Sequence, residues 1–163
     1  MSVHERPVGA TVEWYTPGEL FHALGVTFDL DPAGAGSPTP SDAYCATVWS
    51  HDTDGLAQPW FGHVWLNPPY GPAGVSFSDR MIAHDDGLLL LPSRTETAIY
   101  QRALIAADVA CFLRDRLWFI RKDGFQARSS FGSTLFAFGE WAAQILRRAD
   151  LGVMVVSRPF GGD

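Results

Sequence analysis

The chain has 163 residues, of which 47% are hydrophobic and 18% charged, and its formal net charge is −6. These values fit one globular domain with a sizeable core, and they exclude a disordered chain. No apolar run reaches the length of a membrane span, and residues 1–9 lack the apolar stretch of a signal peptide, so we expect a cytoplasmic protein without a membrane partner.

Residues 1–10 are predicted to form a flexible arm, and residues 11–163 are predicted to form one domain. The run Thr16-Pro17-Gly18-Glu19 has the form of a capping box and predicts a helix that ends at Leu24, before Gly25. Alternating residues predict a strand over 26–30, ending near Asp31. Residues 33–40 are rich in Gly and Pro and cannot form a regular helix.

The rest of the chain continues as short strands alternating with helices. Thr95 is predicted to cap a helix over 96–107, and a second helix is predicted over 141–149. Strands are predicted over 63–66, 87–91, 109–113, 117–120, 135–138 and 153–156. This alternation predicts an α/β domain with a mostly parallel, twisted sheet and helices on both faces. Because ligands bind beyond the carboxyl ends of such strands, the loops to consider are 29–36, 67–70 and 92–97.

The strongest motif is Asn67-Pro68-Pro69-Tyr70, which directly follows the predicted strand 63–66. Two successive prolines give a stiff, extended segment, so the Asn67 side-chain oxygen and the Pro68 carbonyl can converge on one amino group. Two such acceptors suit methylation of an amine conjugated to a ring, whose lone pair must be aimed and whose positive charge must be stabilised. Tyr70 can stack on a base extruded from the double helix. The alternative is a proline-stiffened turn with a half-buried tyrosine.

From Trp14 to about Gly139 the sequence resembles the phage-type DNA N-6-adenine methyltransferase family. Asn67-Pro68-Pro69-Tyr70 is the most specific of the matching pieces. The others are Trp14-Tyr15-Thr16-Pro17, residues 28–33, Asp54-Gly55-Leu56, Pro59-Trp60, Val64-Trp65-Leu66, Leu91-Pro92-Ser93-Arg94-Thr95 with Thr97, and Leu113-Arg114-Asp115-Arg116 with Phe119. The resemblance implies a Rossmann-like methyltransferase fold, the cofactor S-adenosylmethionine and a phage origin.

The resemblance also implies which residues bind the cofactor: Trp14, Thr16, Pro17, Asp31, Pro32, Ala33 and Asp54. Asp31 would accept from the ammonium group of the methionine part, although a turn residue at a strand end is the alternative. Asp54 matches a contact to the cofactor's adenine, although an Asp-Gly turn also explains it. Gly34-Ala35-Gly36 is followed by Pro38 and Pro40, so the helix expected after this loop must be absent, short or displaced.

Nucleic-acid contacts are expected from the second half of the chain. Arg6 is the only Lys or Arg before Arg80, so the first half is strongly acidic and the second slightly basic. Arginine interleaved with aromatic residues over 113–130 suits phosphate contact and base stacking, and it predicts a small basic hairpin insertion; a solvated hairpin is the alternative. The candidate contacts to double-stranded DNA are Arg94, Arg114, Arg116, Arg121, Lys122 and Arg128.

The leading hypothesis is therefore S-adenosylmethionine-dependent methylation of the exocyclic amino group of adenine in DNA. The resemblance further suggests protection of phage DNA from host restriction. Two alternatives use the same residues: methylation of RNA bases or protein glutamine, and a degenerate methyltransferase fold that only binds DNA or a host protein. No pair of Cys or His has metal-ligand spacing, and we expect no metal. Cys45 and Cys111 are expected as buried apolar residues.

Overall fold

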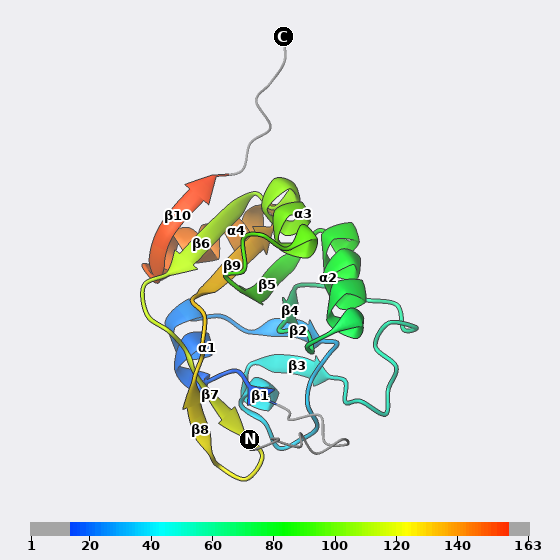
Figure 1. Ribbon diagram of the computed structural model, residues 1–163. Helices are drawn as coiled ribbons and strands as arrows, with labels where there is room; N and C mark the ends of the chain where they lie inside the picture. Colours follow the sequence, from blue (N-terminus) through cyan, green and yellow to red (C-terminus); the bar gives the residue numbers. More distant parts are fainter. Residues whose placement is uncertain (1–13, 157–163) are drawn as a thin grey trace, which may run out of the picture.

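The computed structural model describes residues 14–156, so the expected arm over 1–10 lies outside the described residues (Figure 1). A seven-stranded sheet has the order β10-β6-β9-β5-β4-β2-β3. A second sheet of three strands has the order β1-β7-β8. The strands are β1 Trp14–Tyr15, β2 Phe28–Asp31, β3 Cys45–Val48, β4 Val64–Leu66, β5 Gly87–Pro92, β6 Val109–Leu113, β7 Trp118–Arg121, β8 Gln126–Arg128, β9 Ser133–Phe138 and β10 Gly152–Val156.

The main sheet is mixed, which corrects the expectation of a mostly parallel one. Strands β3, β2, β4 and β5 pair in parallel. Strand β9 is antiparallel to both β5 and β6, and β10 is antiparallel to β6. The reason is local: the chain leaves β6, turns in the β7–β8 hairpin and returns beside β6 as β9, and a direct return of this kind gives an antiparallel pair.

Strands β6 and β9 continue into the β7–β8 hairpin without a change of register. Phe112 is opposite Thr134, and Trp118, six residues later, is opposite Arg128, six residues earlier. A hydrogen bond from the Ser129 amide to the Leu117 carbonyl (2.9 Å) joins the two paired regions. The hairpin therefore extends past the carboxyl edge of the parallel strands, where β1 pairs with β7.

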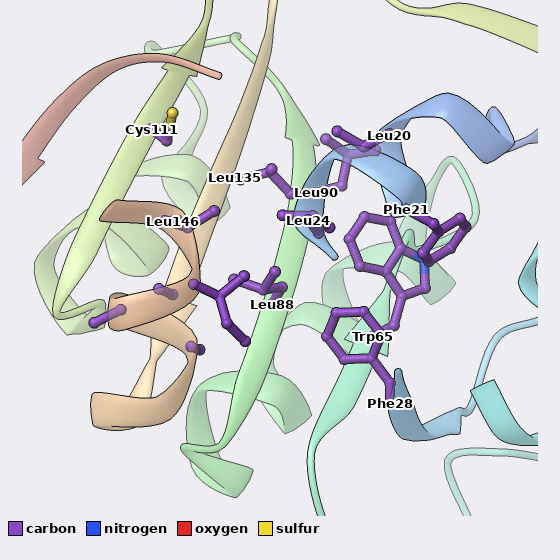
Figure 2. Close-up of a cluster of buried hydrophobic side chains, with 14 of the residues drawn as sticks. Leu20, Phe21, Leu24, Phe28, Trp65, Leu88, Leu90, Cys111, Leu135 and Leu146 are labelled. Carbon is purple, nitrogen blue, oxygen red and sulfur yellow. The ribbon is translucent and has the colours of Figure 1, made fainter. Parts of the chain in front are cut away.

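Helices cover both faces of the main sheet, as predicted (Figure 1). On one face α1 and α4 pack against the core cluster that contains Phe28, Trp65 and Leu88 (Figure 2). On the other face α2 and α3 pack against Leu66, Leu89 and Phe136. The helices are α1 Gly18–Leu24, α2 Pro72–His84, α3 Ala98–Ala106 and α4 Gly139–Ala149. The central strands have continuous apolar sequences because both of their faces are buried.

Sequence-based prediction missed β3, α2 and the pairing of β1 with β7. The capping box at Thr16 was also wrong, because α1 begins at Gly18 with Pro17 as its N-cap, and no side chain makes a capping hydrogen bond there. Gly25 ends α1 as predicted, in the left-handed conformation (φ +67°). The helix expected to be absent, short or displaced after Gly36 is short: a 3₁₀ helix, η1, spans Pro40–Ala43.

Candidate methyltransferase site

The candidate site lies at the carboxyl edge of three neighbouring strands, β2, β4 and β5. Asp31 ends β2, Asn67 follows β4, and Arg94 follows β5 by two residues. Since these strands are parallel and adjacent, their carboxyl ends meet at one edge. The structure therefore brings together the three loops that the sequence predicted, as expected for an α/β sheet.

The Asn67–Tyr70 segment is held between β4 and α2. Leu66 is fully buried, whereas the Tyr70 side chain is 73% exposed. Gly71 has φ +89° and turns the chain into α2, which starts with Pro72. A Cβ on Gly74 would lie 1.9 Å from the Pro69 carbonyl oxygen, so the first turn of α2 packs directly against this segment. The two prolines and this close contact keep the segment rigid.

A large pocket of about 560 Å³ opens beside this segment, which is within the usual size of small-molecule sites. Tyr70 and Val75 contribute to its lining from the Asn67–Tyr70 segment and α2, and Leu90 and Tyr100 from β5 and α3. The other main contribution comes from the β7–β8 hairpin and the residues that follow it: Phe119, Ala127, Arg128, Ser129, Ser130, Phe131 and Ser133. The lining includes two exposed aromatic residues, Tyr70 and Phe131, the second of which is 50% exposed.

A small cleft of about 30 Å³ also borders Asn67, and it is lined by the 3₁₀ helix η1 and the loop after β2. Its main charged group is Asp31, whose side chain is almost fully buried. Burial raises the pKa of the Asp31 carboxyl to about 7, against the opposing effects of hydrogen bonds from the Ala33 amide and the Ser41 side chain. No Lys, Arg or His of residues 14–156 forms an ion pair with it. A buried carboxylate without a cation suits a ligand that carries an ammonium group.

Asn67 and Trp14 are the two residues that line both the large pocket and the small cleft. The Asn67 Nδ2 donates to the Thr16 Oγ1 at 3.1 Å, and among residues 14–156 no group donates to its Oδ1. Thr16 therefore makes a contact to Asn67 in place of the helix cap that its sequence context predicted. This arrangement leaves the Asn67 carboxamide oxygen as a hydrogen-bond acceptor between the two cavities.

The residues predicted to bind the cofactor are not all in one place. Trp14, Thr16, Asp31 and Ala33 line the small cleft. Pro17 and Pro32 are buried next to it and do not line it. Asp54 is exposed and lies in neither cavity, although the neighbouring Gly55 packs so tightly on the Pro32 carbonyl that a Cβ would approach it to 2.1 Å.

The predicted DNA-contacting residues differ in their surroundings. Arg94 and Arg128 line the large pocket, and the Arg94 guanidinium lies over the Phe131 ring, 5.7 Å from its centroid. Three of the arginines have acidic partners: Arg94 pairs with Glu96, Arg114 with Asp150 and Arg121 with Asp123. Arg116, Lys122 and Arg128 are exposed and have no ion-pair partner in the described chain.

Several residues at the site were missed by sequence reasoning. Val75 lines the large pocket from α2, and the Gly71-Pro72 pair was a usable signal for that helix, because proline is favoured at the first helical position. Thr39 and Ser41 line the small cleft from the 3₁₀ helix. Phe131 and Ser133 line the large pocket, and no local sequence pattern distinguished them.

Within the described residues, no helix is long and apolar enough to cross a membrane. The same part of the chain contains no group of three or more His, Cys, Asp or Glu side chains placed to hold a metal ion. Cys45 and Cys111 are buried free thiols.

Comparison with known proteins gives one match. A family model described as DNA N-6-adenine-methyltransferase (Dam) matches residues 5–157. No curated protein and no solved structure matches the chain significantly. The matched range includes both cavities and every residue of the Asn67–Tyr70 segment.

Proposed function

The chain belongs to the DNA N-6-adenine-methyltransferase (Dam) family of enzymes, and from this membership we propose that it transfers a methyl group from S-adenosylmethionine to adenine N6 in double-stranded DNA. The observation that carries the proposal is the position of Asn67 between a pocket large enough to admit a nucleobase and a cleft with a buried carboxylate. A methyl transferase must hold acceptor and donor on opposite sides of one reacting centre.

The large pocket is proposed to receive the adenine. Asn67 Oδ1 and the Pro68 carbonyl would accept the two hydrogens of the amino group and aim the nitrogen lone pair away from the ring. Both acceptors would also stabilise the positive charge that develops on this nitrogen. The exposed Tyr70 ring at the pocket opening supports a stacking role against the extruded base.

The small cleft is proposed to hold the methionine part of the cofactor. The chemistry of the lining fits this group: a buried Asp31 carboxylate without a protein cation would accept from the ammonium, with Trp14, Thr16 and Ala33 around it. The cleft of about 30 Å³ has room for only about two water molecules, so its lining would have to open to admit the methionine part. S-adenosylmethionine, when bound, supplies an electrophilic methyl group on a sulfonium. Pro17, Pro32 and Asp54 do not line the cleft. They would contribute to cofactor binding indirectly, by fixing the backbone segments in which they lie.

DNA would contact the surface around the large pocket. Arg116, Lys122 and Arg128 form no ion pair in the described chain, which supports a role in phosphate binding. Arg94, Arg114 and Arg121 would have to exchange their acidic partners for phosphate. Their contribution is therefore proposed to be smaller, because the pairs with Glu96, Asp150 and Asp123 must first be given up.

The test is transfer of radiolabelled methyl from S-adenosylmethionine to unmethylated genomic DNA, RNA and protein in parallel, followed by nucleoside analysis. Label in N-6-methyladenine of DNA would support the proposal. Label in RNA or in glutamine side chains would assign the same site to another amine. No label in any substrate, with DNA still bound, would identify a degenerate methyltransferase fold.

We further propose that the protein has a phage origin and protects phage DNA from host restriction. This part of the proposal rests on the family resemblance of the sequence. Digestion of genomic DNA from cells with and without this gene, using a panel of restriction enzymes, tests protection: sites that contain the methylated adenine should resist cleavage only when the gene is present.

A further inference from the structure

Thr16 and Asn67 are joined by a hydrogen bond between side chains that lie far apart in the sequence. The Asn67 Nδ2 donates to the Thr16 Oγ1 at 3.1 Å across a separation of 51 residues. The Thr16 residue is 6% exposed, so water competes weakly for this bond. Both residues line the small cleft, and Asn67 also lines the large pocket.

The segment that carries Thr16 is restrained on both sides. Trp14 and Tyr15 pair with Arg121 and Ile120 of β7. Pro17 follows and restricts the backbone of the residue before it, and its carbonyl accepts from the Leu20 amide in the first turn of α1. The Thr16 hydroxyl is therefore presented to Asn67 at a fixed position.

The orientation of the Asn67 carboxamide decides what it can do. With Nδ2 on the Thr16 oxygen, Oδ1 is the end that remains to accept from an amine. Rotation of the carboxamide by half a turn would instead present two N–H donors to an amino group that is itself a donor. The Thr16 hydroxyl can donate as well as accept, so the substrate amine, which only donates here, selects Oδ1 for itself and leaves Nδ2 to Thr16. Loss of the hydroxyl would leave Nδ2 without its acceptor and the carboxamide without the bond that fixes its position.

We propose that Thr16 is a positioning residue, whose hydroxyl oxygen holds the Asn67 carboxamide with its acceptor end toward the substrate amine. The inference rests on the proposed methyl transfer, and it goes beyond it by assigning the Thr16 hydroxyl to orientation of Asn67, while the Thr16 side chain also lines the cofactor cleft, whose shape Thr16→Val preserves. It also explains why β1 is docked on the hairpin: the docking fixes the segment that holds Asn67 in place.

The test compares Thr16→Val, which removes the hydroxyl at nearly constant volume, with Thr16→Ser, which retains it. For Thr16→Val we expect the turnover number at saturating cofactor and DNA to fall by about tenfold to a hundredfold, as for a misplaced reacting group. The dissociation constant of S-adenosylmethionine, measured by calorimetry, should stay within about threefold, a small free-energy change. Thr16→Ser should recover most of the lost turnover.

A double mutant separates this role from a purely structural one. Because Thr16 is proposed to act through Asn67, Thr16→Val added to Asn67→Ala should cause no further loss of turnover. Independent, multiplicative losses would overturn the inference, and so would weaker cofactor binding at an unchanged turnover number.

Thermal unfolding checks that each variant is folded, and Thr16→Ala replaces Thr16→Val if the valine variant does not fold. A wild-type protein that methylates nothing refutes the proposed function itself, whereas an active wild type with a fully active Thr16→Val refutes only the role of Thr16.

Discussion

At the scale of single residues, the proposed methyl transfer depends on hydrogen-bond acceptors and not on a strong base. The nitrogen of a ring-conjugated amine has a delocalised lone pair, so orientation is the main requirement. After transfer the nitrogen carries a positive charge and loses its proton readily to water. This explains why an amide and a peptide carbonyl, at Asn67 and Pro68, can form the core of the site.

Tyr70 gives a residue-scale prediction, since its side chain is 73% exposed and contributes little to the core. We expect Tyr70→Ala to reduce kcat/KM on duplex DNA by an amount on the order of 1–3 kcal/mol, through lost base stacking, with little change in Tm. Tyr70→Phe keeps the ring and is the matched control. A rate on duplex DNA that does not differ between Tyr70→Ala and wild type would remove Tyr70 from the base pocket.

Because of Asp31, we expect both the stability of the fold and the affinity for the cofactor to depend on pH. Its folded-state pKa of about 7 lies above the ordinary value, so it favours the folded state fully at low pH, and this contribution is lost as the pH rises from about 4 through about 7. Without cofactor, Asp31→Asn should reduce the fall in Tm over this range. The ammonium of the cofactor needs the ionised carboxylate and itself stays charged below about pH 7, so wild-type affinity should increase about tenfold from pH 5 to pH 6.

Calorimetric titration of S-adenosylmethionine at both pH values checks the affinity, with Asp31→Asn as the control. That variant should bind more weakly and with little dependence on pH. A wild-type affinity that falls or stays constant over this interval would show that Asp31 does not bind the ammonium group.

The residues next to strand ends could be predicted from the sequence, and those supplied by tertiary pairing could not. The sequence indicated Asp31, Asn67 and Arg94, because each lies at the end of a buried strand or within two residues after it. It assigned Thr16 to a helix cap, because the local pattern was sufficient for that interpretation. The contact of Thr16 with Asn67 depends on how β1 docks on β7, and nothing within either segment encodes that pairing.

At the scale of secondary-structure elements, the first turn of α2 supports the Asn67–Tyr70 segment. Gly74→Ala should displace the Pro69 carbonyl, because the added Cβ would lie 1.9 Å from its oxygen. We expect turnover to fall more than tenfold, as for misplaced reacting groups. Tm should fall too, so turnover and Tm are measured for the same variant.

Gly18→Ala is the matched control for this prediction. Gly18 also lies in the first turn of a helix, and a Cβ there would meet no atom within 4 Å. Its turnover should equal that of the wild type. Equal behaviour of the two variants would show that the packing of α2 on the segment is unimportant for catalysis.

The helices and strands of strong periodicity were predicted well, and the failures have physical reasons. The continuous apolar strand at Gly87–Pro92 and the helix at Gly139–Ala149 are close to their predicted bounds. Strand β3 was missed because it is short and lies at an edge of the sheet. The antiparallel direction of β9 was missed. The direction of a strand depends on how the chain returns from the hairpin, and strand propensity does not determine that path.

At the scale of the whole molecule, an acidic protein with a net charge of −6 must bind DNA through a local surface. Arg128 lies at the large pocket and has no ion-pair partner among the described residues. We expect Arg128→Ala to weaken DNA binding and to reduce the slope of log K against log salt by about one. Arg148→Ala removes the same charge from α4, where it lines neither cavity, and it should leave the slope unchanged. Equal slopes for all three proteins would place the DNA elsewhere.

The role of Asn67 is tested by the rate of N-6-methyladenine formation by Asn67→Ala, measured beside the wild type at saturating S-adenosylmethionine and DNA. We expect the variant to bind the cofactor almost normally and to lose activity by at least about a hundredfold, the scale of losing a key polar group in a transition state. Turnover near the wild-type rate would contradict this role, because the acceptor between the two cavities would then have no part in the reaction.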